Sequence, residues 1–162
     1  MATSNRIAKG VLPGPKPPWL RAAKGEANTC RSVHHLIAGD GLHTVCSEAK
    51  CPNIDECFGS RTATFMIMGA VCSRRCHYCA VEKGTPAPLD ADEPKRVAQA
   101  VAQLQLRHAV ITSVTRDDLP DGGADHFVQT IAAIRRICPD TTVEVLIPDL
   151  ADDALRRVFD AC

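Results

Sequence analysis

Three apolar runs decide the fold of this chain: TATFMIM at residues 62–68, AVITSV at residues 109–114 and TVEVLI at residues 142–147. Each run is short and partly β-branched, as the buried strands of a parallel sheet are. A segment with helical periodicity follows every run, so strands and helices alternate along the chain. Such an alternation predicts a parallel sheet whose crossover connections are right-handed.

The segments that follow the three runs carry apolar residues three or four positions apart, on one helical face. These residues are Val97, Val101 and Leu104 in the first segment, Phe127, Ile131, Ile134 and Cys138 in the second, and Leu155, Val158 and Phe159 in the third. Pro94 suits the first turn of the first helix, and Pro139 ends the second. Asp152 and Asp153 suit the first turn of the third helix.

Three strand–helix units are fewer than a closed parallel barrel needs, and a flavodoxin-like sheet normally has about five strands. We therefore expect an α/β fold in which residues 62–162 form the first half of a larger, partial (β/α) barrel. The third strand of such a sheet has an unpaired apolar edge.

Two further segments precede this barrel portion. Residues 1–28 are expected to form an extended arm, because the run PGPKPP (13–18) is incompatible with a helix interior. Residues 29–61 are expected to form a cysteine-rich extension. It begins with a short helix, TCRSVHHLIA (29–38), which Gly39 would end.

Composition indicates an ordinary globular protein. The chain has 162 residues, of which 45% are hydrophobic and 23% are charged, and its formal net charge is zero. No apolar run approaches the roughly 20 residues of a membrane-spanning helix, and the first ten residues lack the apolar core of a secretory signal. We expect a cytoplasmic protein that binds neither nucleic acid nor membrane. Nine cysteines in such a protein indicate metal binding or catalysis rather than disulfides.

One cysteine group directly follows the first strand. Cys72, Cys76 and Cys79 have the spacing C-x3-C-x2-C, so their thiolates converge from one loop, as ligands of iron–sulfur clusters or zinc do. A structural zinc site normally has four ligands, and the fourth would have to be His77 or a distant residue. Three thiolates instead leave one iron of a cubane cluster open, which favours an iron–sulfur site.

This spacing, with Tyr78 just before the last cysteine, resembles the signature of the radical S-adenosylmethionine superfamily. The resemblance implies that Cys72, Cys76 and Cys79 hold a [4Fe–4S] cluster whose open iron binds S-adenosylmethionine, with Tyr78 against the adenine. It also implies that the reduced cluster cleaves S-adenosylmethionine to methionine and a 5′-deoxyadenosyl radical.

A second triplet, Cys46, Cys51 and Cys57, lies in TVCSEAKCPNIDECFG, for which we expect a loop. Together with PPWLR, RTATFMIMG, TSVTRDDLPDGGADHF and EVLIPD, the two triplets resemble the lipoyl synthase family. The resemblance implies that the second triplet holds an auxiliary [4Fe–4S] cluster, which donates the two sulfur atoms inserted at C6 and C8 of a protein-bound octanoyl-lysine. It implies as partners the octanoylated lipoyl-carrier domains (2-oxoacid dehydrogenase E2 subunits and the glycine cleavage H protein), an electron donor and iron–sulfur assembly proteins.

Several residues near the cluster loop have more than one interpretation. The loop residues Asp117, Asp118 and Asp121 and the strand-end residues Ser113 and Thr115 are candidates for contacts with S-adenosylmethionine. Aspartates also serve turns and helix caps, and strand hydroxyls often bond to the backbone. Glu144 either faces a cofactor or is exposed to solvent. Arg74 and Arg75 either tune the potential of the cluster, meet a carboxylate or are solvated.

Two other functions fit the cysteine pattern. One is a non-catalytic iron–sulfur protein, either a cluster-binding fragment or a partner subunit without turnover. The other is a zinc-binding interaction module. Three cysteines lie outside both triplets; Cys138 fits a core position, and Cys30 and Cys162 have no assigned role.

Overall fold

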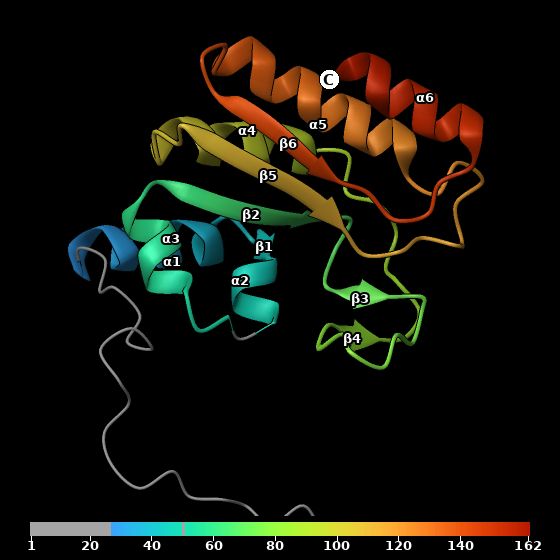
Figure 1. Ribbon diagram of the computed structural model, residues 1–162, viewed down its shortest axis with the longest axis horizontal. Helices are drawn as coiled ribbons and strands as arrows, with labels where there is room; N and C mark the ends of the chain where they lie inside the picture. The colour runs from blue at the N-terminus through green and yellow to red at the C-terminus, as the bar shows by residue number, and fades with distance from the viewer. Residues whose placement is uncertain (1–26, 50) are drawn as a thin grey trace, which may run out of the picture.

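The computed structural model describes residues 27–49 and 51–162 (Figure 1). The predicted arm at residues 1–28 lies outside the described residues, apart from its last two. The described part is mixed α/β, with a four-stranded sheet, a two-stranded sheet and six helices. None of these helices has the length and apolar character that crossing a membrane requires.

The larger sheet has the strand order β1-β2-β5-β6. Strands β2 (Thr62–Ile67), β5 (His108–Ser113) and β6 (Thr142–Leu146) are parallel, and the short β1 (His43–Thr44) runs antiparallel to β2. The three predicted strands and their parallel arrangement are therefore confirmed, whereas β1 was not predicted.

Each parallel strand leads to a helix of the predicted type. These helices are α4 (Glu93–Gln103), α5 (Ala124–Ile137) and α6 (Asp152–Ala161), and Figure 1 shows them on the same side of the sheet. Pro94 lies in the first turn of α4, as expected. Because β2, β5 and β6 are parallel, the loops that leave their carboxyl ends all emerge at one edge of the sheet.

The core lies between the sheet and these helices. The strand register places Phe65 beside Ile111, and both side chains are fully buried. Five helical residues meet this face with at most 1% exposure: Val97, Val101, Phe127, Ile131 and Ile134. In β6, by contrast, Leu146 is 61% exposed. Glu144 is also exposed and lies 2.9 Å from His108, so of its two interpretations the solvent-exposed one describes this structure.

The first helix differs slightly from its prediction. α1 spans Ala27–Gly39, so it starts earlier than expected and includes Gly39. The left-handed residue that ends it is Gly41, with φ +61°, and the N–H of Leu42 reaches back to the carbonyl of Ile37 at 3.0 Å. The helix itself ends one residue later than predicted, and the left-handed glycine that follows it is Gly41 instead of Gly39.

The expected loop around the upstream cysteines is wrong. This segment contains two short helices, α2 (Val45–Glu48) and α3 (Ile54–Gly59). The side-chain oxygen of Thr44 accepts a hydrogen bond from the N–H of Ser47, which caps the start of α2. Such a cap provides a partner for one of the free N–H groups of the first turn, so even a four-residue helix can form between turn-forming residues.

Candidate functional site

The cluster loop, residues 70–84, begins at a sharp backbone turn. The predicted strand 62–68 ends one residue early, because Met68 has φ +68° and Gly69 has φ +94°. These left-handed conformations turn the chain out of the sheet. The loop thus leaves the carboxyl end of β2, the edge where sites collect in parallel α/β folds (Figure 1).

A small second sheet closes the cluster loop. Strands β3 (Val71–Cys72) and β4 (Glu82–Lys83) are parallel, and the N–H of Gly84 donates to the carbonyl of Cys72 at 3.0 Å. Lys83 Nζ donates to the carbonyl of Cys79 at 3.1 Å. All three downstream cysteines therefore lie within one closed loop.

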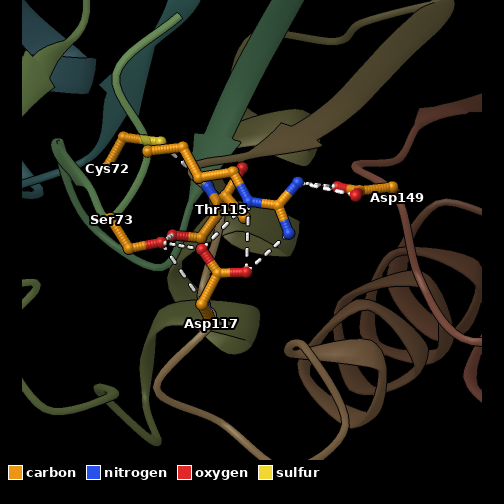
Figure 2. Close-up of polar contacts among 6 residues, drawn as sticks. Cys72, Ser73, Thr115, Asp117 and Asp149 are labelled. Atoms are coloured by element: carbon orange, nitrogen blue, oxygen red, sulfur yellow. Dashed lines mark hydrogen bonds and ion pairs between the residues drawn. The ribbon is translucent and has the colours of Figure 1, made fainter.

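The thiol of Cys72 has the most distinct environment. The backbone N–H of Thr115, in the loop after β5, donates to Cys72 Sγ at 3.3 Å (Figure 2). Burial by itself would raise the pKa of this thiol. Hydrogen bonds from the backbone of Arg74 and Thr115, with the charge of Lys83, outweigh burial, so the pKa lies below its usual value. A thiol with a lowered pKa is a better metal ligand at neutral pH.

The upstream cysteines lie on the neighbouring helical segment. Cys46 is buried in α2, Cys57 lies in α3, and Cys51 lies between the helices with its N–H on the carbonyl of Cys46 at 3.0 Å. Burial raises the pKa of Cys57, and the nearby Cys46, Cys51 and Glu56 raise it further. Cys46 and Cys51 therefore lie near enough to Cys57 to act on its thiol.

Neither triplet has its sulfur atoms arranged around a metal position. Across residues 27–49 and 51–162, no group of three or more Cys, His, Asp or Glu side chains has a geometry that could hold a metal ion. Cys76 and Tyr78 are both exposed, Tyr78 at 93%. The donor chemistry nevertheless fits, because iron–sulfur clusters bind cysteine thiolates and each triplet offers three thiols on one short segment.

A polar network, here called the Arg74 clamp, ties the cluster loop to the other two loops at this edge. Arg74 pairs with Asp117 in the β5–α5 loop, with Nη2 2.6 Å from Oδ1, and with Asp149 after β6, with Nη1 2.5 Å from Oδ1. Ser73 Oγ lies 2.7 Å from Asp117 Oδ2 and 2.9 Å from the carbonyl of Thr115 (Figure 2). Arg74 therefore meets carboxylates, one of its three interpretations.

The clamp also determines the charge of Asp117. Hydrogen bonds from Arg74 and then Ser73 lower the pKa of the Asp117 carboxyl to about 2, so it is ionised near neutral pH. Helix capping, the alternative role for aspartates in this loop, falls instead to Asp121, whose carboxylate accepts from the N–H groups of Gly123 and Asp125.

Two other predicted residues near the clamp differ in how their polar atoms are satisfied. Asp118 receives two hydrogen bonds from the buried Arg116, at 2.8 and 2.7 Å, and these lower the pKa of its carboxyl. Ser113 Oγ, at the end of β5, is buried and has no hydrogen-bond partner among the described residues. Such an unpaired buried oxygen is unusual, and a bound polar ligand would explain it.

A cavity of about 190 Å³ opens beside the clamp. It lies between the loops after β5 and β6, and its walls include Thr115, Asp117, Asp121 and Asp149. Arg116 also lines the cavity, and two of the cavity's carboxylates, Asp117 and Asp149, are paired with Arg74. The cavity therefore has polar walls of both charges and adjoins the clamp.

Sequence reasoning missed three buried polar residues around Met68. Glu93, Arg116 and His126 are each at most 5% exposed. Glu93 precedes the helix-starting Pro94, and His126 lies one residue from the apolar stripe of α5, so both suit ordinary helical positions. No spacing in the sequence shows that the two side chains meet across two helices.

Comparisons with known proteins show which family this chain resembles. The sequence profile of the Radical SAM superfamily matches residues 66–161. The chain is 58% identical over 138 residues to a lipoyl synthase of Oleidesulfovibrio alaskensis, covering 85% of this chain and 47% of that protein. It is 53% identical over 162 residues to a lipoyl synthase of Chloroflexus aggregans, covering 99% of this chain and 51% of that protein.

The chain spans about half the length of the curated relatives it matches. The profile match, in contrast, covers more than half of this chain and includes the C-x3-C-x2-C loop. The predicted resemblance is confirmed, and the chain belongs to the radical S-adenosylmethionine superfamily.

Proposed function

We propose that this chain carries the radical portion of a lipoyl synthase, which inserts two sulfur atoms at C6 and C8 of a protein-bound octanoyl-lysine. The observation that carries the proposal is the pair of thiol triplets, one on the closed cluster loop and one on α2 and α3, in a chain 52–58% identical to lipoyl synthases. In this proposal residues 62–162 are the first half of the barrel, residues 29–61 the cysteine-rich extension, and residues 1–28 an arm.

Cys72, Cys76 and Cys79 are the proposed ligands of a [4Fe–4S] cluster. When bound, such a cluster supplies the electron for reductive cleavage of S-adenosylmethionine. The chain prepares Cys72 for this role, because the N–H of Thr115 stabilises its thiolate. The Arg74 clamp holds the loop against the two neighbouring loops, which fixes where the ligands stand relative to the sheet.

The proposed contacts with S-adenosylmethionine are Tyr78, Ser113, Asp117 and Asp118. Ser113 has the strongest support, because its buried Oγ lacks a partner. Asp117 and Asp118 are ionised and could attract an ammonium group, but each already binds an arginine. A ligand at Asp117 must therefore share this carboxylate with Arg74. Tyr78 must move from its exposed position to cover the adenine.

Cys46, Cys51 and Cys57 are the proposed ligands of an auxiliary [4Fe–4S] cluster, which supplies the inserted sulfur when bound. Because its pKa is raised, Cys57 is a neutral thiol at neutral pH. Cluster binding at this triplet therefore releases protons, and it becomes more favourable as pH rises.

The proposed partners follow from the reaction. Octanoylated lipoyl-carrier domains, namely 2-oxoacid dehydrogenase E2 subunits and the glycine cleavage H protein, are the substrates. An electron donor and iron–sulfur assembly proteins are also needed, and we place the reaction in the cytoplasm.

The test is formation of 5′-deoxyadenosine and of sulfur-containing product after anaerobic cluster reconstitution, with reductant, S-adenosylmethionine and an octanoyl-lysine peptide. Replacing Cys72, Cys76 and Cys79 by alanine should abolish 5′-deoxyadenosine formation. Replacing Cys46, Cys51 and Cys57 should leave it intact and abolish sulfur insertion. Cys138→Ala, which changes a cysteine outside both triplets, is the control. Cleavage that survives loss of the first triplet contradicts the proposal.

A further inference from the structure

We propose that Glu93 and His126 form a buried positioning pair that holds the turn at Met68 and thereby sets the place of the cluster loop for S-adenosylmethionine binding. The inference rests on the proposed function, which it deepens by assigning a role to two residues outside the loop and its cysteines.

Both residues of the pair are buried, and their side chains are in direct contact. Glu93 is 5% exposed and His126 is 4% exposed, and His126 Nε2 lies 2.7 Å from Glu93 Oε2. The same Oε2 atom accepts the backbone N–H of Met68 at 2.8 Å. One carboxylate oxygen thus joins the first residue of α4, the first turn of α5 and the residue that directly follows β2.

The turn at Met68 needs such support. A left-handed backbone is unfavourable for a residue with a Cβ atom, so the φ of +68° persists only if the surroundings hold it. Glu93 binds the N–H of Met68, and Arg116 Nη1 lies 3.5 Å from its carbonyl. The Met68 side chain packs directly against Gly123, since a Cβ atom added to this glycine would lie 2.3 Å from Met68 Sδ. The helix of the first strand–helix unit, through Glu93, and the loop of the second unit, through Arg116 and Gly123, therefore hold this residue.

The pair is placed to influence the loop rather than only the core. α4 and α5 already pack through fully buried apolar residues, including Val101 and Phe127. A buried ionisable pair is a poor way to add stability, because its desolvation offsets its attraction. Its distinctive contact is with the backbone of Met68, four residues before Cys72.

A shift at Met68 would carry Cys72 with it. The thiol of Cys72 reaches Thr115, and the next two residues, Ser73 and Arg74, reach the β5 and β6 loops. A bound S-adenosylmethionine must meet both the cluster and the residues at the ends of the strands. A displacement of the loop therefore misaligns the two halves of its site, a kind of error to which rates and affinities are very sensitive.

The test compares Glu93→Ala with Glu93→Gln in the full chain, reconstituted anaerobically. Glutamine keeps an oxygen that can accept the N–H of Met68, whereas alanine does not. Two readouts are used: amide hydrogen exchange at Met68, and the change in the electron paramagnetic resonance spectrum of the reduced cluster as S-adenosylmethionine is added. Val101→Ala is the control, because it creates a core cavity in α4 away from Met68.

In Glu93→Ala, we expect faster hydrogen exchange at the Met68 amide and binding of S-adenosylmethionine that is about tenfold weaker. Glu93→Gln should remain close to the wild type in both readouts, and Val101→Ala should lose stability without either change. If Glu93→Ala does not fold, His126→Asn replaces it, with smaller effects in the same direction.

Equal S-adenosylmethionine affinity in the wild type and Glu93→Ala overturns the inference, and so does an equal loss of affinity in Val101→Ala. A wild-type cluster whose spectrum does not respond to S-adenosylmethionine contradicts the proposed function instead. In that case hydrogen exchange decides alone: an unchanged Met68 amide in Glu93→Ala overturns the inference, and faster exchange restricted to that variant supports it.

Discussion

The guanidinium of Arg74 lies alongside the carboxylate of Asp117, with Nε and Nη2 both donating to it, while Nη1 reaches Asp149. One side chain of the cluster loop thus joins the loops that follow β5 and β6. The joined segments are far apart in sequence, and the parallel register brings them to one edge. Five predictions follow from the contacts at this edge and from the turn that leads to it.

Arg74→Lys should loosen the cluster loop with little effect on overall stability. Lysine keeps the charge but cannot bind two carboxylates through a planar fork. Exposed ion pairs contribute little to stability, so the melting temperature should stay nearly unchanged. Hydrogen exchange across residues 70–84 should become faster. The control is Arg75→Lys, because Arg75 is the next residue and forms no ion pair in the described part of the chain. Hydrogen exchange across residues 70–84 should be unchanged in this variant.

The Arg74 clamp should be insensitive to pH across the neutral range. The pKa of Asp117 is lowered to about 2 in the folded chain, below its value in an unfolded chain. A lowered carboxyl pKa stabilises the fold above the unfolded pKa, and this contribution is lost as pH falls towards 2. The carboxyl carbon shift of Asp117, followed by nuclear magnetic resonance, should therefore stay constant from pH 8 to about pH 4. A midpoint near 4 would contradict the clamp.

Cys72 should react faster than Cys57 in the cluster-free chain. The pKa of Cys72 is lowered and that of Cys57 is raised, so at pH 8 more of Cys72 is thiolate, the nucleophilic form. Iodoacetamide labelling followed by peptide mass spectrometry measures both rates in one sample. In concentrated urea the two rates should become similar, since the folded environments are lost. Equal rates in the folded chain would be evidence against the Thr115–Cys72 hydrogen bond.

Gly123→Ala should destabilise the chain by about 1–3 kcal/mol or more. Gly123 has φ +90°, and an added Cβ would lie 2.3 Å from Met68 Sδ. The matched control is Gly39→Ala, where no atom lies within 4 Å of the added Cβ and φ is not positive. Alanine there should be neutral or stabilise by up to about 1 kcal/mol. Urea unfolding of both variants checks the difference.

Ser113→Ala should have the same thermal stability as the wild type in the absence of S-adenosylmethionine, but it should bind S-adenosylmethionine more weakly. The buried Oγ has no partner among the described residues, so its removal breaks no hydrogen bond. Thr112→Val, at the preceding position, removes a bond of 2.7 Å to the carbonyl of Leu146 and should cost about 1 kcal/mol. Thermal melts and equilibrium titration separate the two effects. Unchanged binding in Ser113→Ala would remove Ser113 from the proposed site.

The sequence predicted the elements that depend on local pattern. The spacing of apolar residues predicted the three parallel strands and the helices that follow them. In segments of this length, burial of one apolar face largely decides whether a strand or a helix forms. It missed α2, whose four residues depend on a single cap from Thr44. It also missed β3 and β4, each two residues long, because their pairing depends on contacts within the folded loop.

The candidate site shows the same division. Cysteine spacing predicted the ligands of one cluster and the family resemblance those of a second, and both assignments remain predictions because neither triplet is arranged around a metal position. Whether Arg74 meets Asp149 or Glu93 meets His126 depends on how distant elements pack, and one-dimensional spacing does not record this. The backbone turn at Met68 was likewise unexpected, because methionine rarely adopts a positive φ and only the surrounding contacts explain it.

The packing of Met68 against Gly123 has a consequence for how this sequence can drift over generations. A larger residue at position 123 requires a shorter side chain at position 68, and it must also adopt the left-handed φ of +90° that favours glycine. A change at position 123 therefore depends on an earlier change at position 68, whereas position 68 can shorten while Gly123 is kept. Anyone who recombines segments of related chains between these positions should keep both from the same parent.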